Sequence, residues 1–104
     1  MGEVRWTSQA LEDIRSIAEF ISRDSVKYAE IQVARFFAHE NLLATNCQIG
    51  RVVPELGNEQ IRELISGSYR IIYTVVHTNR VDVITIHHSS RILKNNPTFR
   101  KPML

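Results

Sequence analysis

The sequence predicts an α+β fold in which a helical hairpin packs on a twisted, mainly antiparallel sheet, in the order β-α-α-β-β-β. In the first half of the 104-residue chain, apolar residues recur at helical spacing. The second half consists of β-branched and aromatic runs separated by glycine and asparagine turns. The length suits a single domain, 1–104, and we expect a flexible basic tail at about 97–104.

The first two elements are a strand and a helix. Glu3–Trp6 has strand propensity, and Thr7 or Ser8 can cap the following helix by accepting hydrogen bonds from free backbone N–H groups. We expect this helix to end near Ser22–Arg23. Its apolar stripe consists of Leu11, Ile14, Ile17, Ala18 and Ile21.

A second helix follows almost without a loop, which predicts an antiparallel hairpin. Asp24 and Ser25 can cap this helix, and we expect it to run to about Ala44. Asn46–Asn58 is then the one long loop. The buried stripe of the second helix would be Ala29, Val33, Phe36, Phe37 and Leu43.

Three strands complete the predicted sheet. They are Ile61–Ile65, Tyr69–His77 and Arg80–His88, with turns at Ser66-Gly67-Ser68 and Thr78-Asn79. The second and third of these strands are apolar on both faces, which is typical of central strands.

Composition limits the classes of protein. The net charge is +2, and no apolar run approaches the ~20 residues that cross a bilayer. Cys47 is the only cysteine, so an internal disulfide is excluded and we expect a cytoplasmic protein. Between Val83 and Leu104 there is no acidic residue, and the basic ones are Arg91, Lys94, Arg100 and Lys101.

The histidines and glycines do not predict a metal site or a cofactor site. His87 and His88 are adjacent on a strand and must point to opposite faces. His39 and His77 have no second ligand at a suitable spacing, and the glycines are too scattered to form a phosphate loop.

Several motifs occur in a fixed order along the chain. They are Trp6-Thr7-x-x-Ala10-x-x-Asp13-Ile14, Gly50-Arg51-Val52-Val53-Pro54-Glu55, Ile61-Arg62-Glu63-Leu64-Ile65-x-Gly67-x-Tyr69-Arg70, and His87-His88-x-x-Arg91. Together they resemble the RelE/ParE superfamily of toxins, over about Val4 to Leu93, and are most similar to its ParE-like branch. The resemblance implies a type II toxin that a cognate antitoxin neutralises in a hetero-oligomer. RelE-like members cleave mRNA on the ribosome, whereas ParE-like members poison DNA gyrase without catalysing a reaction.

The basic residues favour the ParE-like branch. Cleavage of RNA needs groups that move protons and cations that bind the phosphate. Arg70 and Arg91 match two arginines of the RelE-like enzymes. The preceding strand offers Arg62 beside Glu63 where a cationic cluster is wanted, and no tyrosine follows Arg91.

Two alternatives remain open. If the last hairpin turns at Thr78-Asn79, Arg70 lies opposite His87, and Arg70, His87 and Arg91 could form the site of an endoribonuclease. The favoured interpretation is that Arg70 is a structural residue that anchors the sheet and that His87 covers it. A decayed toxin that only binds the antitoxin is the other alternative.

We expect the antitoxin to lay an amphipathic or extended segment across the helix pair and the sheet. Its acidic side chains would then meet the basic residues, which favours fast and specific association. The expected contact residues are Arg62, Arg70, Arg91 and Lys94.

Overall fold

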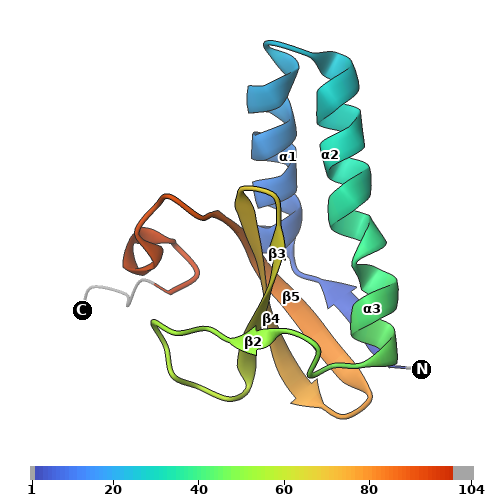
Figure 1. The fold of residues 1–104 in the computed structure, drawn as a ribbon, viewed down its shortest axis with the longest axis vertical. Helices are drawn as coiled ribbons and strands as arrows, with labels where there is room; N and C mark the ends of the chain where they lie inside the picture. Colours follow the sequence, from blue (N-terminus) through green and yellow to red (C-terminus); the bar gives the residue numbers. More distant parts are fainter. Residues whose placement is uncertain (1, 100–104) are drawn as a thin grey trace.

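The computed structural model describes residues 2–99 and confirms the predicted α+β fold. A mixed five-stranded sheet in the order β1-β5-β4-β3-β2 carries a helical hairpin on one face (Figure 1). β1 pairs in parallel with β5, and the other neighbouring strands are antiparallel. The strands are β1 (Glu3–Trp6), β2 (Arg51–Val52), β3 (Ile61–Ser66), β4 (Tyr69–His77) and β5 (Arg80–His88).

The hairpin consists of α1 (Ser8–Ser22) and α2 (Val26–Ala38). The side chains of Thr7 and Ser25 cap the two helices by accepting from the third backbone N–H group that follows, at 3.2 and 3.0 Å. Both helix starts were therefore correctly predicted. Figure 1 shows α1 and α2 running side by side past the end of the sheet.

The prediction of one continuous second helix was wrong, because the helix is interrupted at His39. Nδ1 of His39 lies 2.7 Å from the carbonyl oxygen of Arg35, which would otherwise accept the backbone N–H of His39. That N–H instead bonds to the carbonyl of Phe36, three residues back. A separate helix, α3 (Glu40–Thr45), follows.

The sequence also missed β2, which lies inside the predicted long loop. Its two residues, Arg51 and Val52, pair with Glu63 and Arg62 of β3. A strand of two residues has no alternation that a pattern could reveal. β2 therefore makes β3 an inner strand over part of its length.

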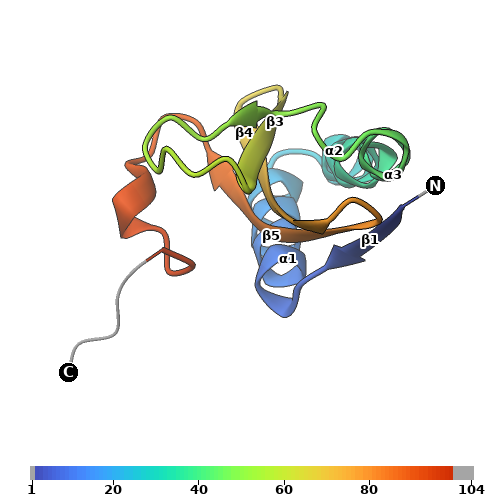
Figure 2. The same cartoon turned by 90° about the horizontal axis from the view of Figure 1, so that it is seen from below.

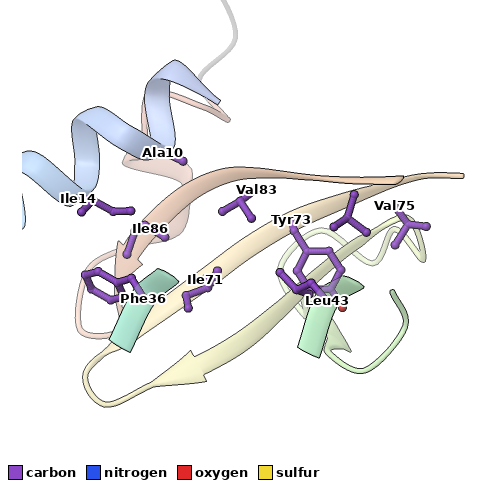
Figure 3. Packing of buried hydrophobic residues seen from close by; sticks show 10 residues of the cluster. Ala10, Ile14, Phe36, Leu43, Ile71, Tyr73, Val75, Val83 and Ile86 are labelled. Atoms are coloured by element: carbon purple, nitrogen blue, oxygen red, sulfur yellow. The ribbon is translucent and has the colours of Figure 1, made fainter. Parts of the chain in front are cut away.

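The main core lies between the hairpin and the sheet, where Tyr73 and Phe36 are fully buried (Figure 3). The predicted stripes were nearly right, but Leu11 and Phe37 are 45% and 39% exposed. On α1, the small Ala10 is buried instead of Leu11, whereas Ile14 and Ile17 of the predicted stripe do face the core. The labelled members of the cluster are Ala10, Ile14, Phe36, Leu43, Ile71, Tyr73, Val75, Val83 and Ile86.

The C-terminal segment, residues 91–99, follows β5 and contains a 3-10 helix, η1 (Leu93–Asn95) (Figure 2). Leu93 is buried with Val53 and Ile72 in a second, smaller core, and Phe99 packs against it. Phe99, which belongs to the predicted tail at 97–104, packs against this smaller core. Residues 100–104 of that tail lie outside the described residues.

Candidate functional site

Arg70 is held on β4 by two carboxylates. Its Nε lies 2.6 Å from Oε1 of Glu63, and its Nη1 and Nη2 each lie 2.7 Å from an oxygen of Glu55. The Arg70 side chain is buried, and all three of its nitrogens donate to these carboxylates. The planar fork of an arginine suits such two-point contacts with carboxylates, and it suits contacts with phosphates equally well.

Arg51 completes a loop ion-pair network that consists of Arg51, Glu55, Glu63 and Arg70. Its Nε lies 2.6 Å from the second oxygen of Glu63, whose side chain is fully buried. The hydrogen bonds that Arg70 donates lower the pKa of Glu55 to about 2, and the two accepting carboxylates, Glu55 and Glu63, raise the pKa of Arg70. The network fastens the 46–58 loop to the sheet, and each of the three nitrogens of Arg70 already donates to a carboxylate.

His87 lies directly opposite Arg70, as the sequence predicted. Its ring is buried, with Nε2 3.0 Å from the carbonyl oxygen of Arg91 and Nδ1 3.0 Å from Nδ2 of Asn96. Both ring nitrogens are therefore engaged within the protein. Arg70, His87 and Arg91 are therefore neighbours in the structure. However, the side chains of Arg70 and His87 are both bonded to other groups of the protein.

Arg62 lies away from the other basic candidates. It follows Ile61 and precedes Glu63 on β3, so its side chain leaves the sheet on the face opposite to that of Glu63 and Arg70. Its Nη1 donates to the carbonyl oxygen of Gly50 at 3.0 Å. The four basic residues expected to contact an antitoxin consequently do not form one patch.

Arg91 and Lys94 are exposed on the C-terminal segment. Arg91 lines a cleft of about 750 Å³ between α1 and that segment, which we call the C-terminal cleft. Its mouth is apolar, since the side chains of Phe20 and Ile92 are 65% and 61% exposed. Among its lining residues, α1 contributes Asp13, Ile17 and Phe20, and the C-terminal segment contributes Arg91, Ile92 and Asn96.

Metal chemistry gains no support from the side chains. Within residues 2–99, no three histidine, cysteine or acidic side chains gather in a way that could hold a metal ion. In the same part of the chain, every helix is too short or too polar to cross a bilayer.

A family described as "ParE toxin of type II toxin-antitoxin system, parDE" matches residues 4–93. The chain belongs to this family. The comparison with curated proteins gives no match. A solved structure described as the "Chromosomal ParDE TA system from P. aeruginosa" is similar in fold, with a TM-score of 0.69 at 16% identity. The similarity covers 85% of this chain and 96% of the other.

This ParE-family chain has site residues that sequence reasoning missed. Glu55, the partner of Arg70, was noted only as part of a loop motif. Asp13, Thr85 and Asn96 form buried hydrogen bonds beside the C-terminal cleft. The sequence contained one signal of this. Asp13 lies beside the apolar stripe of α1, and a carboxylate in that position needs a hydrogen-bond partner.

Proposed function

We propose that this chain is a toxin that inhibits bacterial growth by binding and poisoning DNA gyrase, and that an antitoxin neutralises it at the C-terminal cleft. Membership of the ParE toxin family supports a toxin that acts in a toxin–antitoxin pair. The observation that favours binding over RNA cleavage is the occupied state of Arg70. An arginine whose charge two carboxylates already neutralise stabilises the developing charge on a phosphate less than a free arginine does.

The C-terminal cleft offers the chemistry that an acidic amphipathic segment needs. Phe20 and Ile92 can receive apolar anchors, while Arg91 in the lining and the nearby Lys94 attract acidic side chains. Arg62 and Arg70 were also expected to contact the antitoxin, but their internal contacts leave that role to Arg91 and Lys94.

The target is tested by inducing the chain in a bacterium that lacks the antitoxin, while thymidine and amino acid incorporation are followed together. We expect DNA synthesis to stop first while translation continues. An initial collapse of translation would instead indicate a RelE-like endoribonuclease. If neither process changes, the chain is a decayed toxin that only binds the antitoxin.

The neutralising contact is tested with Arg91→Glu in cells that co-express the antitoxin. We expect this charge reversal to weaken neutralisation. Arg35→Glu is the matched control, because Arg35 is an exposed arginine on α2 that does not line the C-terminal cleft. Equal neutralisation of both variants would contradict the assignment of the cleft.

A further inference from the structure

A chain of buried and partly buried hydrogen bonds runs from α1 through β5 to the C-terminal segment. Oδ2 of Asp13 accepts from the hydroxyl of Thr85 at 2.5 Å and from the backbone N–H of Ile86 at 3.2 Å. The hydroxyl oxygen of Thr85 in turn accepts from Nδ2 of Asn96 at 3.1 Å. Residues 13 and 96 are thereby joined through a fully buried threonine.

The chain continues from Asn96 to His87. Nδ2 of Asn96 uses its second hydrogen on Nδ1 of His87 at 3.0 Å, and Nε2 of His87 lies 3.0 Å from the carbonyl oxygen of Arg91. Oδ1 of Asn96 accepts the backbone N–H of Thr98 at 2.9 Å. His87 and Asn96 are 5% and 8% exposed, so water does not readily replace these partners.

The two ends of this chain fix the direction of every hydrogen bond. A carboxylate only accepts, so the single hydroxyl hydrogen of Thr85 points to Asp13 and the oxygen must accept from Asn96. The N–H of Thr98 only donates, which independently assigns the oxygen of the Asn96 carboxamide. Nδ1 of His87 is therefore an acceptor, and its Nε2 carries the proton that is donated to Arg91.

We propose that this chain is a pH-sensitive latch, in which neutral His87 holds the C-terminal segment in place and protonation of its Nδ1 releases it. A proton on Nδ1 would face the amide hydrogens of Asn96. Turning the carboxamide over does not remove the conflict. Its oxygen would then face the Thr85 oxygen, and its NH₂ group would face the N–H of Thr98.

The surroundings of His87 do not offset this conflict. The charged groups that line the C-terminal cleft beside it are Asp13 on α1 and Arg91 on the C-terminal segment, which also carries Lys94, and Arg70 lies opposite it on β4. Arg70 is neutralised by its own two carboxylates, and Asp13 is separated from the imidazole by Thr85 and Asn96. His88, the neighbour on β5, points to the other face and contacts Ser90 and Tyr69.

Release would change the surface that a partner meets. The C-terminal segment forms one wall of the C-terminal cleft, and its Leu93 and Phe99 cover Val53 and Ile72. Opening the latch would remove Arg91 from the cleft and expose the smaller core. The latch itself consists of contacts within this chain and needs no partner. Its effect on antitoxin binding rests on the proposed function.

The test is a nuclear magnetic resonance titration of the full chain. At the higher pH, where His87 carries one ring proton, we expect that proton on Nε2. At the lower pH, where the ring gains its second proton, the folded-state signals of the Asn96 side-chain amide and the Thr98 backbone amide should be lost together. A proton on Nδ1 at the higher pH would overturn the proposal, as would unchanged Asn96 and Thr98 signals while His87 titrates.

The matched variant is His87→Asn, whose carboxamide oxygen can accept from Asn96 but cannot titrate in this range. We expect its C-terminal segment to stay in place at both pH values, while His88→Gln should titrate as the wild type does. Release in His87→Asn, or its loss in His88→Gln, would contradict the latch. If release occurs and the antitoxin still binds with unchanged affinity, the latch stands and the antitoxin site in the cleft fails.

Discussion

Arg70 and Glu55 are joined by a two-point ion pair, in which Nη1 lies 2.7 Å from Oε2 and Nη2 lies 2.7 Å from Oε1. From the sequence, this arginine was one candidate for a phosphate-binding residue in the alternative of a RelE-like endoribonuclease. In the structure it fastens a loop to the sheet together with Glu63. Removing a structural arginine destabilises the fold, whereas removing a catalytic arginine need not.

Arg70→Met should destabilise the fold strongly. The substitution keeps most of the buried volume but leaves the buried carboxylate of Glu63 with Arg51 as its remaining ion-pair partner. Removing one member of a buried ion pair costs about 3–5 kcal/mol when the other charge is left unpaired, and the remaining Arg51 contact places this variant at the lower end. Urea unfolding measures the free energy, with Arg91→Met as the exposed control. A difference below about 1 kcal/mol between the two variants would show that the network does not hold the loop.

Acid should weaken the fold through Glu55. Arg70 lowers the pKa of this carboxyl from 4.5 to about 2 in the folded protein. Because the folded-state pKa lies below the unfolded value, the ion pair stabilises the fold above pH 4.5, and this stabilisation is lost as the pH falls towards 2. The side chain is 46% exposed, so solvent screening limits the effect to about 1 kcal/mol.

The variant Glu55→Gln isolates that contribution. Its free energy of unfolding should fall less steeply than that of the wild type between pH 4.5 and 2. Glu59→Gln serves as the control, because Glu59 is an exposed carboxylate in the same connection between β2 and β3. Parallel pH profiles for the wild type and Glu55→Gln would refute the assignment.

Tyr73→Phe should also destabilise the fold, although it removes only one oxygen atom. The hydroxyl of Tyr73 accepts the backbone N–H of Gly50 at 2.9 Å in a buried position. An unpaired buried donor costs about 1–3 kcal/mol. Tyr28→Phe is the control, since Tyr28 is 47% exposed. Thermal unfolding should give a lower Tm for Tyr73→Phe alone, and equal values would contradict this role.

The opposition of Arg70 and His87 was predicted correctly, but for an incomplete reason. A two-residue turn sets that register at His77 and Arg80. The register then shifts by one residue between Val75 and His77 and shifts back beside Ile72 and Tyr73. The two irregularities cancel. Counting outward from the turn therefore gives the right pair, although neither irregularity can be detected in the sequence.

Local patterns predicted elements well and long-range partners poorly. The bounds of β4 and β5 follow from β-branched runs and a short turn, and they match the prediction. Glu55 reaches Arg70 through a loop without periodicity, and Asp13 reaches Thr85 from 72 residues away. Such pairs depend on how the elements pack, which spacing along the chain does not encode.

The proposal that the antitoxin binds at the C-terminal cleft can be tested by substituting two exposed isoleucines that lie on different surfaces. Ile92, at the cleft, is 61% exposed, and Ile65, on β3, is 55% exposed. Burying such a side chain in an interface contributes about 1.5–3 kcal/mol, so Ile92→Ser should weaken antitoxin binding about 10- to 100-fold. Ile65→Ser should leave the affinity unchanged. Titration calorimetry of each variant with the antitoxin measures both. The reverse result would move the antitoxin to β3, where it would add a strand to the sheet.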